Sequence, residues 1–476
     1  MNASNTHAVT QSGAPVRTLE LSGAGLLACL VGAALPPIDL FVVNVALPNV
    51  QAGLAASPAE LQWVVAAYGI GFALLLVVGG RLGDTFGRRR LFVLGLAGFT
   101  ATSLICGLAP TAVVLVLARA AQGASAAMLA PQVLSVIQAT TTGDRRARAL
   151  GYYGATGGIS MVVGQIAGGL LVAADIAGTG WRPVFLVNVP IGVVAIVLAL
   201  RFLPETKAAH PLGVDAVGTC LLGVSLLALL VPLMQGTTVG WPLWCWVLLV
   251  LAPVLFAAFV AVEARAERRG RVPLLPPSVM TLSSMRLGLL IAAPFFLAFG
   301  GFLFVYTLVL QDDLRLGPMS AGLALTPLGL AMLVLALAAS RLVGRLGNRV
   351  VTIGGLFLLF GPLVLVAVAV PAWPHVTLAG LLPGTALFGV GIGLVSPTLF
   401  RVILSRVPTQ TAGVGSGALA TTQQLSTALG VATLGSLFTV LRPVDPEIAL
   451  VVVLVTIAGI AAAIAILSRG LPDPRE

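Results

Sequence analysis

The chain has 476 residues, of which 58% are hydrophobic and only 9% are charged, and its mean hydropathy is +1.06. This composition excludes an ordinary soluble domain, in which roughly a quarter of the residues are charged. The formal net charge of +10 does not indicate a nucleic-acid partner, because the arginines stand in short clusters between apolar runs and not along one polar face. The composition predicts an all-α polytopic membrane protein.

Cysteine and histidine indicate neither a disulfide framework nor a metal site. The four cysteines lie within or at the edge of apolar runs and show no CxxC spacing. The three histidines lie outside the apolar interiors. We expect no metal and no cofactor.

In chain order, residues 1–21 are polar, and the apolar run that follows is too long for the core of a signal peptide. We therefore expect a cytoplasmic tail before the first span. Apolar runs separated by turn and charge signals predict fourteen spans. They cover roughly residues 22–46, 60–82, 90–109, 111–136, 148–172, 183–202, 213–233, 241–262, 286–311, 319–343, 350–370, 375–404, 411–440 and 447–468.

The arginines predict the orientation of these spans. With the N-terminus inside, 22 of the 26 Lys and Arg residues lie on inner loops or the adjacent helix ends. Only Arg182, Arg315 and Arg442 lie outside, and Arg119 lies within a span. This asymmetry follows the positive-inside rule and predicts that both termini are cytoplasmic.

A loop motif occurs twice. GRLGDTFGRRR (residues 80–90) joins the second span to the third, and SRLVGRLGNRV (residues 340–350) joins the tenth to the eleventh, on the same side. The spacing indicates a parallel repeat of six-helix units, which favours alternating access about a midplane site, although two arginine-rich loops can also match by chance. The predicted regions are a tail (1–21), an N-terminal six-helix bundle (22–202), a two-helix insert with flanking cytoplasmic loops (203–285), a C-terminal six-helix bundle (286–468) and a second tail (469–476).

Several segments resemble one family. GGRLGDTFGRRR resembles motif A of the major facilitator superfamily, and IDLFVVNVALP (38–48) resembles the first-helix motif of its fourteen-helix drug:proton antiporters. LARAAQGASAAMLAP (117–131) is similar to motif B, WRPVFLVNVPIG (181–192) to the start of the sixth helix, and GVGSGALATTQQLSTALGVA (413–432) to the thirteenth. The resemblance implies the major-facilitator fold, two six-helix bundles plus two extra central helices, and proton-coupled multidrug efflux.

Two ionisable residues lie well inside predicted spans. Asp39 follows Pro36 and Pro37, which should break the first helix. Burial favours the neutral form of a carboxyl group, so Asp39 is a candidate proton carrier; alternatively, it satisfies backbone groups at a helix end. Arg119 cannot deprotonate and must act by position, or else anchor packed helices. The resemblance to motif B implies a proton-coupling role for Arg119.

The motif A loop combines small and charged residues. Its glycines permit close helix approach and tight turns, and its arginines also set topology. By resemblance, the loop is a conformational latch between the two halves. The latch residues are Gly80, Gly83, Asp84, Gly87, Arg88 and Arg89.

The fifth span contains glycine pairs that permit close packing of another helix. The pairs Gly154/Gly158 and Gly164/Gly168, with Gly169, resemble the antiporter motif C, but Gln165 stands where that motif has proline. The packing role should survive this change, whereas the kink is in doubt. Polar residues on the spans are candidates for a substrate cavity or for bonds between helices. They are Asn44, Gln122, Gln165, Asn188, Gln423 and Gln424.

Together these features predict a monomeric secondary transporter in a bacterial inner membrane that exports small, largely apolar organic compounds in exchange for protons. Its partners would be the lipid bilayer, the organic substrate and protons, with the proton gradient as the energy source and no nucleic acid. Uptake of a nutrient on the same fold is the alternative. An enzyme is not expected, because no HExxH or GxSxG motif and no paired interior carboxylates occur.

Overall fold

A computed structural model describes residues 21–207, 213, 215–271, 273–407 and 412–472. Residues 1–20 and 473–476 of the predicted tails lie outside the described residues. Within the described part, fourteen helical segments are long and apolar enough to cross a membrane. This confirms the predicted fold class and the predicted number of spans.

The long helices follow one another through short connections. They are α1 (Gly23–Leu54), α2 (Pro58–Phe86), α3 (Arg88–Gly107), α4 (Ala112–Thr140), α5 (Gly143–Ala173), the broken pair α6 (Pro183–Leu186) and α7 (Asn188–Phe202), α8 (Ala216–Val239), α9 (Leu243–Arg268), α11 (Ser283–Leu308), α12 (Pro318–Leu346), α13 (Arg349–Ala372), α14 (Leu378–Leu404), α15 (Ala412–Leu441) and α16 (Pro446–Leu467). A short helix, α10 (Pro277–Met280), precedes α11, and a π-helical turn, η2 (Val309–Asp313), follows it.

Local signals explain where helices start. Ser57 and Glu60 form a reciprocal capping box at the start of α2, with Pro58 in the first turn. The separation of the third and fourth spans is confirmed, because α3 ends at Gly107 and the side chain of Thr111 caps α4.

The expected break in the first helix is wrong. Helix α1 is continuous from Gly23 to Leu54, with Pro36 and Pro37 inside it. The prolines cannot donate to the carbonyls one turn earlier, but neighbouring helices can supply donors inside a membrane bundle.

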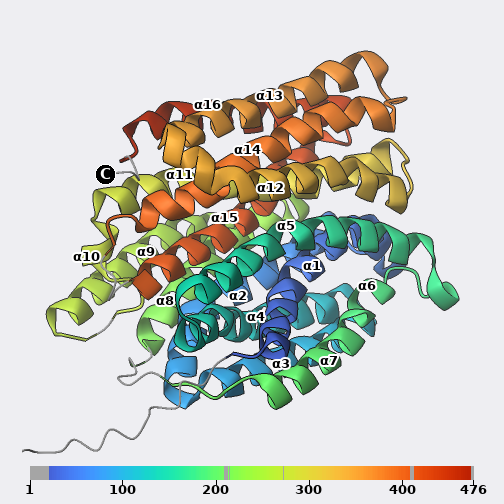
Figure 1. Cartoon of the computed structure of the whole chain (residues 1–476). Helices are drawn as coiled ribbons and strands as arrows, with labels where there is room; N and C mark the ends of the chain where they lie inside the picture. Colours follow the sequence, from blue (N-terminus) through green and yellow to red (C-terminus); the bar gives the residue numbers. More distant parts are fainter. Residues whose placement is uncertain (1–20, 208–212, 214, 272, 408–411, 473–476) are drawn as a thin grey trace, which may run out of the picture.

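The helices form two bundles, α1–α7 and α11–α16, and Figure 1 shows them as the lower and upper parts of the molecule. The contacts within one bundle recur in the other: α1 packs on α5 as α11 packs on α15, and α2 packs on α4 as α12 packs on α14. Helices α8 and α9 pack on each other, and α8 contacts α2 and α15. Helix α9 leaves much of its apolar surface exposed, including Leu243, Trp246 and Val250.

Four helix pairs join the bundles: α2 with α15, α5 with α12, and α1 with both α11 and α12. One end of the molecule, here called the arginine-rich end, holds Arg88, Arg89, Arg145 and Arg146 at the junctions α2–α3 and α4–α5. At the opposite end the side chain of Gln311 in η2 donates to the carbonyl of Val45 on α1 at 2.7 Å. That end is therefore tied together across the two bundles.

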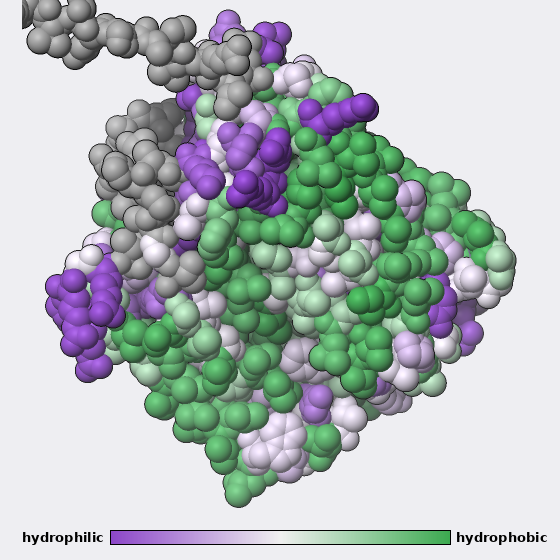
Figure 2. All heavy atoms as spheres, turned by 90° about the horizontal axis from the view of Figure 1, so that it is seen from below, coloured by the Kyte–Doolittle hydropathy of each residue, from purple (hydrophilic) through white to green (hydrophobic). Residues whose placement is uncertain are grey.

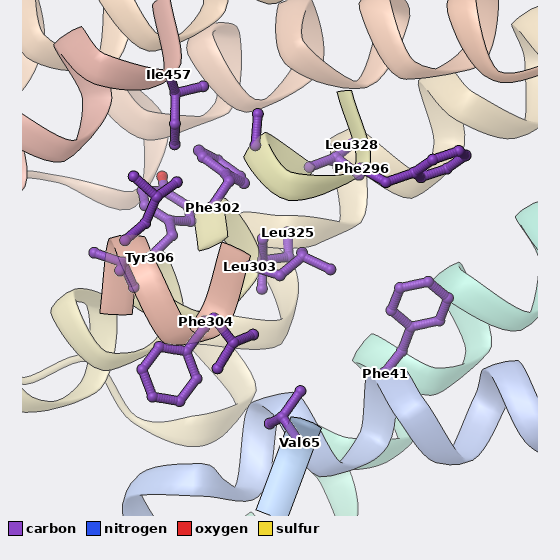
Figure 3. Close-up of a cluster of buried hydrophobic side chains, with 14 of the residues drawn as sticks. Phe41, Val65, Phe296, Phe302, Leu303, Phe304, Tyr306, Leu325, Leu328 and Ile457 are labelled. Atoms are coloured by element: carbon purple, nitrogen blue, oxygen red, sulfur yellow. The ribbon is translucent and has the colours of Figure 1, made fainter. Parts of the chain in front are cut away.

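Hydrophobic side chains fill the interior and cover most of the outside. Figure 3 shows part of a buried cluster that includes Phe41 of α1, Val65 of α2 and Phe304 of α11, so one apolar core joins both bundles. On the face seen in Figure 2, hydrophobic side chains predominate, and hydrophilic ones gather near the edges. Such a surface suits a chain surrounded by lipid.

Candidate functional site

The two charges predicted inside the spans form an ion pair. Asp39 on α1 and Arg119 on α4 are both completely buried, and Nη1 of Arg119 donates to Oδ2 of Asp39. The contact spans 80 positions in the sequence and could not have been read from it. The pair lies inside the N-terminal bundle and not between the two bundles.

Amide and hydroxyl groups complete the surroundings of Asp39. Its Oδ1 accepts hydrogen bonds from Nε2 of Gln122 at 3.0 Å and from Nδ2 of Asn188 at 2.8 Å. Both amides also donate to the hydroxyl of Ser103 on α3, at 2.7 and 3.3 Å. Gln122 and Asn188, predicted as candidates for the substrate cavity, therefore bind the buried carboxylate in this structure.

Arg119 has further partners on α2 and α4. Its Nε donates to the carbonyl of Val64 at 3.1 Å, and its Nη1 donates to Oε1 of Gln122 at 2.7 Å. The guanidinium carbon lies 4.4 Å from the centre of the Tyr68 ring, within the range of a cation–π contact. Among the described residues, Nη2 of Arg119 has no hydrogen-bond partner.

The arginine of this pair depends on its partner for neutrality. A buried guanidinium keeps its charge and needs a counter-ion in an apolar interior. Asp39 supplies that counter-ion in this structure.

The latch residues contact mainly the N-terminal bundle in this conformation. Arg88 donates to Oδ1 of Asp84 at 2.8 and 3.1 Å, and to the carbonyl of Ser135 on α4 at 3.4 Å. The backbone N–H of Arg89 donates to Oε1 of Glu205, after α7, at 3.2 Å. Gly87 has a φ of +114°, which favours glycine at this sharp turn.

The other two latch glycines differ in how closely α4 approaches them. A methyl group on Gly83 would lie 2.0 Å from Oε1 of Gln132 on α4, so this side chain would have to move. The same group on Gly80 would lie at an ordinary 3.7 Å from Cβ of Pro131. Close packing therefore applies to Gly83 and not to Gly80.

The glycines of α5 allow close packing against two different helices, α1 and α12. A methyl group on Gly164 or Gly168 would lie within about 3 Å of α1, at 2.7 Å from Cβ of Phe41 and 3.0 Å from the carbonyl oxygen of Val42. On Gly158 or Gly169 it would lie 2.9 Å from α12. A methyl group on Gly154 would meet no atom within 4 Å.

The remaining cavity candidates lie apart from the ion pair. Asn44 is buried and donates to the carbonyl of Leu40 in its own helix at 2.9 Å. Gln165 is fully buried on α5, and neither its oxygen nor its nitrogen has a partner among the described residues. Gln423 and Gln424 are half-buried on α15, where the carbonyl of Gln424 approaches Gly69 of α2.

The match to a family model decides the classification. Residues 29–431 match the model described as Major Facilitator Superfamily. The chain belongs to the major facilitator superfamily. Members similar to it include the "Probable actinorhodin transporter" of Streptomyces coelicolor, 40% identical over 84% of this chain and 70% of the relative.

Other superfamily members show comparable similarity. The "Puromycin resistance protein pur8" of Streptomyces alboniger is 38% identical over 87% of this chain and 81% of its own length. The "Cephamycin export protein CmcT" of Amycolatopsis lactamdurans is 38% identical over 89% of this chain and 86% of its own length. Among solved structures, a POT family transporter superposes with a TM-score of 0.71 at 13% identity, over 95% of this chain and 98% of that one. At this identity the likeness shows the shared fold alone.

The two bundles of this superfamily member differ at the ion pair. In the N-terminal bundle Gly123 approaches the carbonyl of Tyr68, and in the C-terminal bundle Gly389 approaches that of Leu328 in the same way. Arg119 lies one turn before Gly123, and Thr385 lies one turn before Gly389, so these two residues occupy equivalent positions. Helix α1 contacts α5 as α11 contacts α15, and in this comparison Asp39 is equivalent to Ala298. The C-terminal bundle therefore has no ion pair at this place.

Sequence reasoning missed three residues of this superfamily member that take part in polar networks. Ser103 bridges two amides, but a single serine in a span carries no signal of its own. Glu205 was a detectable candidate, because it is an isolated acid on a predicted inner loop, on the same side of the membrane as the arginine-rich motif A loop. Glu263 is 1% exposed, so Asp39 is not the only interior carboxylate among the described residues.

Proposed function

We propose that this chain is a drug or antibiotic exporter that expels small, largely apolar organic compounds in exchange for protons by alternating access. Its similarity to proteins named for actinorhodin transport, puromycin resistance and cephamycin export supports the general class. The observation that carries proton coupling is the buried pair of Asp39 and Arg119.

The pair can couple because it has two exclusive states. In one state Arg119 neutralises Asp39, and the remaining carboxylate oxygen accepts from Gln122 and Asn188. In the other state a proton neutralises Asp39, and Arg119 must turn to water or to another acceptor. Access from one side of the membrane then determines which state is favoured, as proton exchange requires.

We place both termini and the arginine-rich end in the cytoplasm of a bacterium, in line with the excess of arginine there. The substrate would then enter from the cytoplasmic side and leave on the other.

The test measures how much of a probe compound accumulates in cells that lack their own drug exporters and express this protein. We expect wild-type protein to lower the accumulation of a puromycin probe, and this effect to vanish when a protonophore collapses the proton gradient. Asp39→Asn keeps the size of the side chain but loses its charge, one of its two acceptor oxygens and its exchangeable proton. It should return accumulation to the level of cells with an empty vector.

Asp144→Asn is the matched control, since Asp144 is an exposed carboxylate in the first turn of α5. It should export like wild type at equal membrane abundance. Full gradient-driven export by Asp39→Asn would remove Asp39 from the mechanism. Accumulation that rises in wild-type cells would instead support uptake.

A further inference from the structure

A second group of charges, two of them buried and one half-buried, lies at the arginine-rich end, outside the Asp39 network. Glu263 near the end of α9 has 1% of its surface exposed, and Arg81 near the end of α2 has 6%. Asp215 caps the start of α8. The group therefore lies where the pair α8–α9 meets the N-terminal bundle.

The two carboxyl groups face each other across a glycine. Asp215 accepts from the N–H groups of Gly218 at 2.9 Å and Leu274 at 3.3 Å, and Oε2 of Glu263 accepts from that of Leu275 at 2.6 Å. A methyl group on Gly218 would lie 2.3 Å from Oε1 of Glu263 and 2.6 Å from Oδ2 of Asp215. Among the described residues, this buried Oε1 has no donor.

Repulsion between neighbouring carboxylates disfavours a second negative charge, above all on a group as buried as Glu263, so this arrangement favours one proton on the pair. Burial by itself would raise the pKa of Asp215. Hydrogen bonds from Glu263 and from the N–H groups of Gly218 and Leu274, together with the charge of Arg81, lower this pKa below its usual value. Asp215 is therefore the ionised member, and the proton belongs to Glu263.

The charged neighbours of this pair are few. From α2, the guanidinium of Arg81 donates to the carbonyl of Gly213 at 2.8 Å and to that of Pro273, so it holds both segments that flank the carboxyl groups. One turn after Glu263, Glu267 bonds to Ser278 instead. The described parts of α8 and α15 bring no charged side chain to the pair.

We propose that Glu263 and Asp215 form a proton-binding site separate from Asp39, in which Glu263 donates its proton through Oε1 to Oδ2 of Asp215. Loss of this proton to water would place two negative charges across Gly218. Their repulsion would push the start of α8 away from the end of α9, next to the segments that Arg81 of α2 holds through the carbonyls of Gly213 and Pro273. Helix α2 also packs against α15 of the other bundle. The packing of α8 and α9 on each other and on α2 would therefore depend on pH.

Infrared spectroscopy of the full-length protein in lipid tests the proposal without transport. A protonated carboxyl group has a carbonyl stretch that a carboxylate lacks. We expect this band at neutral pH in wild type, in Asp39→Asn and in the control Glu267→Gln, and its loss in Glu263→Gln. A band unchanged in Glu263→Gln would overturn the proposal, whereas a failure of proton-coupled export would leave this result intact.

Thermal unfolding gives a second readout. At neutral pH the folded protein would hold one proton on Glu263, which the unfolded chain would have released. Because the folded state then binds more protons, stability must fall as the pH rises toward alkaline values. Glu263→Gln should flatten this fall, and Glu267→Gln should not. Identical slopes for wild type and Glu263→Gln would contradict a shared proton.

Discussion

Arg119 carries a charge that it cannot lose, and it sits where no water reaches it in this structure. A permanent buried charge needs partners in the protein. For Arg119 these are Asp39, one glutamine, one backbone carbonyl and an aromatic ring. The sequence could single out both ions because a charge within an apolar span is costly. It could not pair them, because their contact depends on how α1 and α4 pack.

Removing one member of the pair should cost more than removing both. Arg119→Gln would leave Asp39 as a buried charge without its counter-ion, and we expect it to destabilise the protein by about 3–5 kcal/mol. In the double variant Asp39→Asn/Arg119→Gln no charge remains, so most of this loss should be recovered. Thermal unfolding of the purified proteins measures both effects, and equal stability of the single and double variants would contradict the argument.

At the scale of helices, hydropathy predicted the spans well because each needs about 20 apolar residues. The prediction failed at the prolines of α1, where a local rule was overridden by packing. The break between α6 and α7 and the π-helical turn after α11 were also not predicted. Such irregularities depend on neighbouring helices and not on composition.

Some glycines lie where two helices are in close contact, and others lie where there is open space around the helix. A methyl group on Gly123 would lie 2.0 Å from the carbonyl oxygen of Tyr68, a backbone atom that cannot turn away. Gly123→Ala should therefore destabilise the α2–α4 contact by about 1–3 kcal/mol. The matched variant Gly154→Ala enters open space and should stabilise α5 by about 0.5–1 kcal/mol. Chemical or thermal unfolding compares the two; equal effects would show that the close contact does not matter.

At the scale of the whole molecule, the two bundles share one contact pattern but not one chemistry. The ion pair belongs to the N-terminal bundle, and the equivalent positions of the C-terminal bundle are Ala298 and Thr385. The repeated loop motif indicated the two halves in the sequence, and Gly87 and Gly347 both have positive φ at the matching turns. The loop motif could not reveal that the two bundles differ at the ion pair, because the loop lies far from Asp39 and Arg119.

The bundles are also separated unevenly along their length. On α5, Gly158 and Gly169 lie against α12, at Leu333 and Pro318. One turn from Gly158 toward the arginine-rich end, Gly154 faces open space, and Leu337 of α12 is 61% exposed. Helices α5 and α12 therefore diverge toward the arginine-rich end, while Gln311 ties the opposite end together.

In the alternating-access cycle proposed above, closing the arginine-rich end would require α5 and α12 to meet at Gly154. We expect Gly154→Leu to leave the thermal stability equal to or slightly above that of wild type, because the side chain enters open space. It should nevertheless abolish transport, because the added side chain would occupy the closing contact. The control is Gly459→Leu on α16, another helical glycine with open space around it and far from this contact. Both variants are compared by puromycin accumulation and by thermal unfolding at equal abundance. Wild-type transport by Gly154→Leu would mean that α5 and α12 do not close at this glycine, and the cycle would have to close elsewhere.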